Sequence, residues 1–178
     1  MHPAVTRYLD IEYLDIKIYG MTHFGHQLSI DLDAPPSTVW RVIAAYDRDP
    51  EWRTGVRMTV EPAGLVRDGT VTYESLRMLG STHRTTARIC DVVPERSFRF
   101  ISGDGKVEGT RVIAPVARGS RLTVTIRIAV PRMLAPLAPV LGWVFRRRVR
   151  RDLERLRMLL TAGEQRSPAN LIASPRRG

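Results

Sequence analysis

The chain has 178 residues, which suits one domain, and 43% of them are hydrophobic, which is enough to fill a core. Its most apolar stretch, residues 133–145, is shorter than the roughly 20 residues that span a bilayer and contains two prolines, which excludes a transmembrane helix. The net charge is +10, and Cys90 is the single cysteine, which excludes an intrachain disulfide and a thiolate metal cluster.

The first twenty residues differ from the rest of the chain and contain the short repeat YLDI-EYLDI. We interpret residues 1–20 as an extension that is disordered, or that precedes a true translation start at Met21. An extra edge strand, YLDIKIY, is the alternative. Because this start carries acidic residues and lacks the apolar segment of a signal peptide, we expect a cytoplasmic protein.

A strand followed by two short helices is predicted next. Residues 24–33 alternate between apolar and polar side chains, which is typical of a half-buried strand, and Pro35 ends it. Pro36 suits the first turn of a helix, because a helix needs no N–H at that position. Residues 37–43 continue this helix with one apolar side, and residues 51–53 are predicted to form a second short helix.

Six further strands are predicted between residues 56 and 130. Each is an alternating segment bounded by glycine, proline or other turn residues. The segments are residues 56–61, 70–79, 82–93, 97–102, 107–116 and 121–130. Their length and spacing are typical of an antiparallel meander, in which each strand pairs with its neighbour in the chain and needs no crossover.

The C-terminal part of the chain is predicted to be helical from about Pro139 to residue 162, because apolar side chains recur there along one broad helical face. Gly163 is predicted to end the helix, and residues 163–178 to form a disordered tail. We therefore predict one α+β domain over residues 21–162. It consists of a curved seven-stranded antiparallel sheet, two short helices and a long C-terminal helix across the concave face.

A series of short motifs resembles the START-like, or SRPBCC, superfamily. In chain order they are IDLDAPPSTVW (30–40), DPEW (49–52), Gly69-Thr70, DVVPERSF (91–98), GSRLTV (119–124) and LERL (153–156). The likeness covers about residues 24–162 and is closest to the bacterial polyketide cyclase/dehydrase and lipid-transport group. It implies a helix-grip fold, also called START/Bet v 1-like, with an apolar cavity between the sheet and the long helix.

The resemblance does not fix a reaction, because the superfamily includes cyclases, lipid carriers and proteins with no known ligand. Cyclising members carry aromatic residues and an inward arginine on the strand that follows the hairpin. The matching inward positions here are His83, Thr85, Ala87 and Ile89, and none of them is an arginine. This departure argues against cyclase chemistry.

The hairpin near Gly80 lets us predict which side chains face the cavity. A two-residue loop at Gly80-Ser81 pairs Glu74 with Ala87, and side chains alternate between the two faces. One face carries three arginines and is predicted to face solvent, so the other faces the helix. With Trp52 and two residues of the long helix, the predicted ligand-binding residues are Trp52, Thr72, Glu74, Leu76, Met78, His83, Thr85, Ala87, Leu141 and Phe145.

Glu74 and His83 are the candidate catalytic residues. A carboxyl group and an imidazole in one apolar pocket can exchange protons with a bound ligand. The alternatives are that Glu74 pairs structurally with an arginine, or that both residues lie at the rim. The histidines lack metal-ligand spacing and the glycines lack the dinucleotide-binding pattern, so we expect neither a metal nor another cofactor.

The three tryptophans have different predicted places. Trp40 lies at helical spacing from other apolar residues and is predicted to lie in the core. Trp52 is predicted to pack in the core or to cap the cavity mouth. Trp143 is predicted to face the core or a ligand.

The long helix carries a run of arginines, with seven between residues 146 and 157 against two acids. We predict that Arg146, Arg147, Arg150 and Arg151 make weak, reversible contact with an anionic membrane surface beside the apolar stretch 133–145. A solvated outer helix face is the alternative. No aromatic or groove-reading element is interleaved, so we expect no specific nucleic-acid partner.

Three functions remain open. The first is the binding or carriage of a hydrophobic small molecule, lipid or polyketide-like, in the cavity. The second is a polyketide cyclase/dehydrase-type enzyme, and the third is a protein that docks on a membrane or macromolecule through its basic helix. We favour the first, because the sequence offers a cavity face and no convincing catalytic set.

Overall fold

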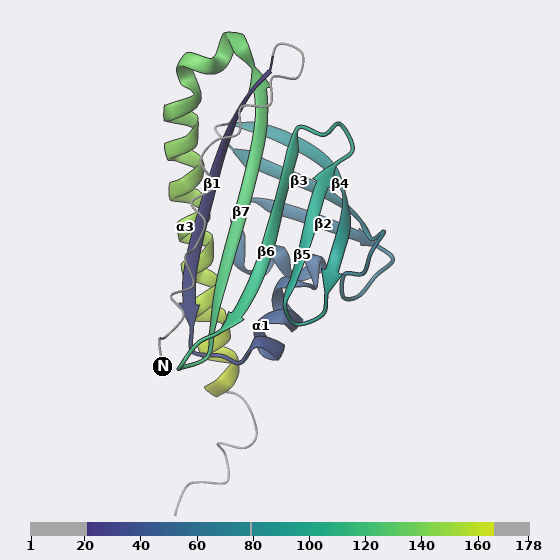
Figure 1. The fold of residues 1–178 in the computed structure, drawn as a ribbon, viewed down its shortest axis with the longest axis vertical. Coiled ribbons are helices and arrows are strands. Elements are labelled where there is room, and N and C mark those ends of the chain that lie inside the picture. The colour runs from purple at the N-terminus through teal and green to yellow at the C-terminus, as the bar shows by residue number, and fades with distance from the viewer. Residues whose placement is uncertain (1–20, 79, 166–178) are drawn as a thin grey trace, which may run out of the picture.

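A long helix lies along the concave side of a twisted antiparallel sheet in the computed structural model, which describes residues 21–78 and 80–165 (Figure 1). The seven strands are β1 (Met21–Leu32), β2 (Val56–Glu61), β3 (Val71–Met78), β4 (Ser81–Val93), β5 (Ser97–Ser102), β6 (Val107–Pro115) and β7 (Ser120–Pro131). The helices are α1 (Pro36–Ile43), the 3-10 turn η1 (Tyr46–Arg48), α2 (Asp49–Trp52), the 3-10 turn η2 (Arg132–Leu137) and α3 (Ala138–Gln165). The predicted α+β helix-grip class is confirmed.

The sheet has the strand order β1-β7-β6-β5-β4-β3-β2, and every neighbouring pair is antiparallel. Strands β2 to β7 follow one another as the predicted meander. β1 pairs with β7 along its full length, and side chains on the outer face support this pairing. Ser29 and Thr123 share a hydrogen bond of 2.9 Å between their hydroxyl groups, and Asp31 pairs with Arg121 at 2.6 Å.

The core lies at the end of the sheet that α1 covers. Pro36 occupies the first turn of α1 as expected, and Trp40 packs edge-to-face on Phe98 at 5.8 Å between ring centroids. The predicted core position of Trp40 is therefore confirmed. The C-terminal half of α3 adds Leu153, Leu156 and Leu160 to this core. Each buried side chain of this size contributes roughly 1.5–3 kcal/mol by leaving water.

Two local predictions differ from the structure. The β3–β4 ladder ends on the pair Met78 and Ser81, so Leu76 lies opposite His83 instead of Thr85. Gly80 has a φ of +80°, which only glycine adopts readily, and this places the turn one position earlier than predicted. The partners shift by two residues, so each side chain keeps its predicted face.

The second difference is the end of α3. The helix continues past Gly163 to Gln165, because glycine weakens a helix without necessarily ending it. The predictions for residues 1–20 and 166–178 lie outside the described residues. None of the helices within residues 21–78 and 80–165 is both long enough and apolar enough to cross a membrane.

Candidate functional site

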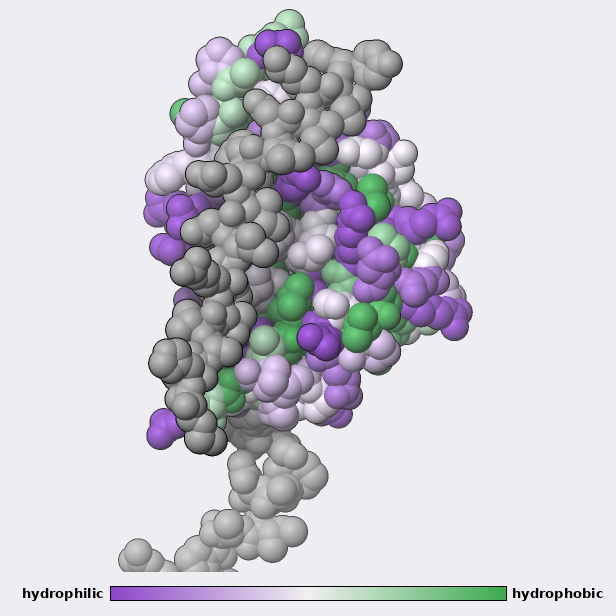
Figure 2. Space-filling view, viewed as in Figure 1, coloured by the Kyte–Doolittle hydropathy of each residue, from purple (hydrophilic) through white to green (hydrophobic). Residues whose placement is uncertain are grey.

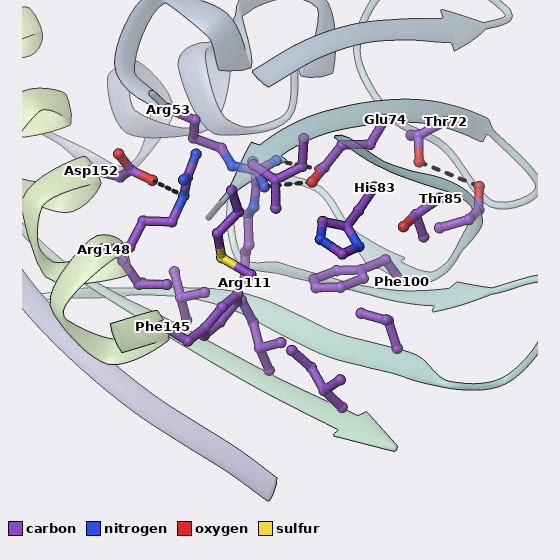
Figure 3. Close-up of a pocket in the computed structure, with 18 of the residues that line it drawn as sticks. Arg53, Thr72, Glu74, His83, Thr85, Phe100, Arg111, Phe145, Arg148 and Asp152 are labelled. Carbon is purple, nitrogen blue, oxygen red and sulfur yellow. Dashed lines mark hydrogen bonds and ion pairs between the residues drawn. The ribbon is translucent and has the colours of Figure 1, made fainter. Parts of the chain in front are cut away.

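A cavity of about 440 Å³ lies between the sheet and α3 (Figure 3). Its volume falls in the range of roughly 300–1,000 Å³ that is usual for small-molecule sites. Apolar side chains form most of the wall on both sides. From the sheet these are Phe24, Leu76, Met78, Ala87, Phe100, Val107, Val124, Ile126, Ile128 and Val130, and from α3 they are Leu141, Val144, Phe145, Val149 and Leu153.

All ten residues predicted to bind a ligand lie in the cavity wall. They are Trp52, Thr72, Glu74, Leu76, Met78, His83, Thr85, Ala87, Leu141 and Phe145. The alternation of side chains along β3 and β4 brings the hairpin residues to one face, and the two-residue shift of the ladder leaves that face unchanged. Their part in binding a ligand stays a prediction.

Glu74 is held in a two-pronged ion pair with Arg53. The guanidinium donates from Nη1 to Oε2 at 2.7 Å and from Nη2 to Oε1 at 3.0 Å, the geometry in which arginine holds a carboxylate most firmly. Burial opposes the charge on Arg53, but Glu74 and Asp49 outweigh it and raise the pKa of Arg53. Figure 3 shows these side chains meeting at one end of the cavity.

A second ion pair is more deeply buried. The side chains of Arg111, on β6, and Asp49, at the start of α2, are 5% and 0% exposed and meet at 2.6 Å. Arg111 also donates to the backbone oxygen of Ile43 at 2.8 Å. Its guanidinium lies over the rings of Tyr46 and Trp52, at 4.5 and 5.1 Å from their centroids. These contacts satisfy a charge that burial alone would make costly.

Asp49 joins the two ion pairs, because its Oδ2 also accepts from Arg53 at 2.9 Å. Burial raises the pKa of Tyr46 to about 12, so its hydroxyl stays protonated beside Arg111. We call the group Tyr46, Asp49, Trp52, Arg53, Glu74 and Arg111 the closed end of the cavity. Two arginines and two carboxylates balance there, so this end is polar but has no net charge.

Trp52 is buried at the closed end and belongs to the core, so its predicted packing in the core is confirmed and the alternative, that it caps the cavity mouth, is not. The helix α2 turns its ring inward beneath Arg111. The buried indole N–H has no hydrogen-bond partner among residues 21–78 and 80–165. An unpaired buried donor of this kind costs roughly 1–3 kcal/mol.

Asp152 ties α3 to the segment between α2 and β2. It accepts from the backbone N–H and hydroxyl of Thr54, at 3.1 and 3.2 Å. Burial raises the pKa of Asp152, although Thr54 and Arg148 counteract part of this effect. Arg148 reaches across to donate to the backbone oxygens of Thr54 and Arg77. The middle of α3 is therefore anchored over the cavity by polar contacts.

The opposite end of the cavity is open. Among the described residues of the cavity wall, His83 alone is exposed, and it lies near the tip of the β3–β4 hairpin. β4 pairs with β5 only from Ala87 onward, and β7 pairs with β6 only as far as Ile128. The β3–β4 hairpin and the pair formed by β1 and β7 thus project past the β5–β6 turn. We call the half-buried wall residues Met78, Val130, Leu141 and Val144, together with His83, the open end.

The candidate catalytic pair is not assembled. Glu74 and His83 are diagonal neighbours on the inner face of the β3–β4 hairpin, but the carboxylate of Glu74 is held by Arg53, and no hydrogen bond joins Glu74 to His83 among the described residues. The structural pairing of Glu74 with an arginine is the alternative that is observed. Within the part of the chain that the structure describes, no three histidine, cysteine or acidic side chains gather in a metal-binding arrangement.

Sequence reasoning missed Arg53, Arg111, Arg148 and Asp152. The sequence contained one indication of Arg111: it lies on the same face of its predicted strand as the apolar residues Val107 and Ile113. That indication is ambiguous, since the other face of the same strand also carries a valine and an alanine. The ion-pair partners lie 21 and 62 residues apart, a separation at which no local pattern operates.

The four arginines predicted to contact a membrane, Arg146, Arg147, Arg150 and Arg151, are exposed on α3. Trp143 is exposed as well and faces neither the core nor the cavity, so both predictions for it are wrong. Its position on α3 lies on the side opposite Leu141 and Phe145. Arg147 lies over its ring at 5.5 Å from the centroid.

Comparisons with known proteins agree with this architecture. The family described as "Polyketide cyclase / dehydrase and lipid transport" matches residues 24–161. The protein TTHA0849 from Thermus thermophilus is 21% identical, with a TM-score of 0.64 over 79% of this chain and 98% of that one. SA2116 from Staphylococcus aureus is 8% identical, with a TM-score of 0.67 over 82% and 98%.

A third similar structure is the di-domain ARO/CYC StfQ from the steffimycin biosynthetic pathway. It is 13% identical, with a TM-score of 0.67 over 80% of this chain and 52% of that one. At these identities the three structures show the fold alone. No curated protein is similar enough to this chain to count as a match.

Proposed function

Because the chain belongs to the polyketide cyclase / dehydrase and lipid transport family, we propose that it binds and carries a hydrophobic small molecule, lipid or polyketide-like, in the cavity under α3. The observation that carries this proposal is the cavity of about 440 Å³ with apolar walls from both the sheet and the helix. A void of this size loses packing contacts, which an apolar ligand would restore.

The closed end indicates the polar part of such a ligand. The charges of Arg53, Glu74, Arg111 and Asp49 already satisfy one another, so they do not require a charged ligand. We infer a mainly apolar molecule whose polar part is neutral.

Carriage is favoured over catalysis because the carboxylate of Glu74 is committed to Arg53. Cyclase or dehydrase chemistry on a polyketide-like chain is the second candidate, because the description of the matching family names it as well. If His83 acts as an acid–base group, His83→Ala abolishes turnover of a polyketide mimic. A carrier would bind the mimic and release it unchanged.

The direct experiment is native mass spectrometry of the chain purified from its own host. We expect a co-purifying apolar molecule. Long-chain alcohols and ketones are then titrated while the melting temperature is followed. A ligand present at about 100 times its Kd stabilises the fold by roughly 2.7 kcal/mol, which raises the melting temperature by several degrees.

Two variants test the placement of the ligand. Ala87→Phe fills part of the cavity and should abolish binding, whereas Thr86→Phe lies on the exposed face of the same strand and should not. Equal binding by Ala87→Phe and Thr86→Phe would rule out the cavity as the site.

A further inference from the structure

The start of α3 exposes an unusual amount of apolar surface. Half of the large hydrophobic residues that are exposed in the described chain lie between residues 133 and 143, so they are not scattered singly. We call these residues the apolar tip: Met133 at 83% exposure, Leu134 at 37%, Leu137 at 52%, Val140 at 60% and Trp143 at 60%. The turn η2 has no buried residue at all. Such patches on soluble proteins mark interaction sites.

Arginines flank this tip. Residues 132–151 contain six arginines and no acidic residue. Arg148 turns inward to the backbone oxygens of Thr54 and Arg77, and the other five are exposed. We call these five the flanking arginines: Arg132, Arg146, Arg147, Arg150 and Arg151. None of the five has a carboxylate partner among residues 21–78 and 80–165.

The apolar and basic groups share one side of the helix. At 100° per residue, Val140, Trp143, Arg147 and Arg150 fall within one quadrant of α3, opposite the cavity-facing Phe145. Figure 2 shows hydrophobic and hydrophilic side chains gathered at the end of the molecule where α3 begins. Exposed apolar side chains beside basic ones are typical of helices that lie in the surface of an anionic bilayer.

We propose that the apolar tip and the flanking arginines form a docking surface for an anionic lipid bilayer. Met133, Leu137 and Trp143 enter the headgroup region, and the arginines pair with lipid phosphates. A bilayer matches both halves of the surface. A nucleic acid matches only the charge, and a second copy of the chain presents the same positive charge and is repelled.

The docking surface lies beside the cavity mouth. The turn η2 follows directly after β7 and leads into α3 (Figure 1). Val130 of β7 and Leu141 of α3 both line the cavity. Docking therefore brings the open end close to the bilayer surface, where an apolar ligand can pass between lipid and cavity. The transfer of a ligand between bilayer and cavity rests on the proposed carrier function, whereas membrane contact itself does not.

Trp143 provides the readout. Trp40 and Trp52 are buried, so a change in tryptophan emission on adding vesicles reports on Trp143. We expect a blue shift with vesicles of phosphatidylcholine and phosphatidylglycerol in about equal amounts, none with phosphatidylcholine alone, and weakening by salt as the Debye length shrinks. Trp143→Ser should remove the shift.

Changing Arg146, Arg147, Arg150 and Arg151 to glutamine should lower the vesicle partition coefficient by up to about 600-fold, because each basic residue near an anionic surface contributes roughly fivefold. The control changes Arg57, Arg67, Arg88 and Arg118 to glutamine. It removes the same charge from exposed positions remote from the tip and should have a much smaller effect.

Several results would overturn the proposal. They are an equal loss in both arginine variants, vesicle binding without a shift of Trp143 emission, tight binding of duplex DNA with no binding of vesicles, or a dimer that Trp143→Ser dissociates.

The cavity variant Ala87→Phe separates this proposal from the carrier function. If it docks on vesicles normally but no longer takes up a vesicle-borne fluorescent lipid, both proposals stand. If uptake by Ala87→Phe equals that of the wild type, the carrier function fails while docking survives.

Discussion

The two ends of the cavity are built in opposite ways. At the closed end, buried charges from α2, β3 and β6 satisfy one another, and α1 and the C-terminal half of α3 pack around them. At the open end, wall residues are half-buried, and the start of α3 exposes apolar and basic side chains. The same helix forms both ends, so the difference comes from what each half contacts.

The arginines at the two ends of the molecule therefore have different roles. Arg53 and Arg111 are committed to carboxylates inside the protein, so they shape the cavity and hold it in place. The flanking arginines have no such partner among the described residues and remain able to meet an external anion. A buried ion pair is destabilised strongly when one member is removed, whereas exposed charges contribute little to folding.

The largest expected effect comes from breaking the closed end. Asp49→Ala leaves Arg111 buried without its carboxylate, which should destabilise the fold by roughly 3–5 kcal/mol in urea denaturation. Glu51→Ala is the matched control, because Glu51 lies in the same short helix and forms an exposed pair with Arg48. It should cost about 0–1 kcal/mol. Equal losses would show that the buried network does not hold the closed end.

The two halves of α3 should respond differently to the same truncation. Leu156 is fully buried, so Leu156→Ala should cost roughly 2–5 kcal/mol through lost burial and a new void. Leu141 faces a cavity that already exists, so Leu141→Ala should cost about 1 kcal/mol or less. Thermal unfolding of both variants, without added ligand, measures the difference. A larger loss for Leu141 would mean that the open end is as tightly packed as the core.

A smaller, pH-dependent effect is expected where β1 meets α3. Burial and then the charge of Arg146 lower the pKa of His26 below its ordinary value of 6.5. The folded state thus resists protonation, so the stability that neutral His26 supports is present above about pH 6.5 and is lost as pH falls through the lowered pKa. His26→Gln should flatten this part of the stability profile. Parallel profiles for the wild type and His26→Gln would contradict the prediction.

The smallest effect on folding is expected at the apolar tip. Trp143→Ser should change the free energy of unfolding by no more than about 0.5 kcal/mol, because the ring is largely exposed. The same variant should lose the response to anionic vesicles. A large loss of stability would instead assign Trp143 a structural role and remove the contrast between the two ends.

The amino-acid sequence by itself determined the order and type of the elements and the faces of the hairpin. Alternation with period two and the turn residues between segments are local signals. The predicted faces of β3 and β4 were therefore right, although the predicted cross-strand partners were wrong by two residues. All ten predicted wall residues therefore reached the cavity. The run of arginines in α3 and the apolar stretch before it were also evident from the sequence alone.

Only the tertiary structure decided which charges meet and which side chains stay exposed. Arg111 and Asp49 are far apart in the chain, and the β6 position that brings them together depends on the whole sheet. The exposure of Trp143 depends equally on how α3 is rotated over the cavity, which the contacts of Asp152 and the packing of Leu156 fix. Sequence periodicity describes one element at a time, whereas pairing and exposure are properties of elements packed together.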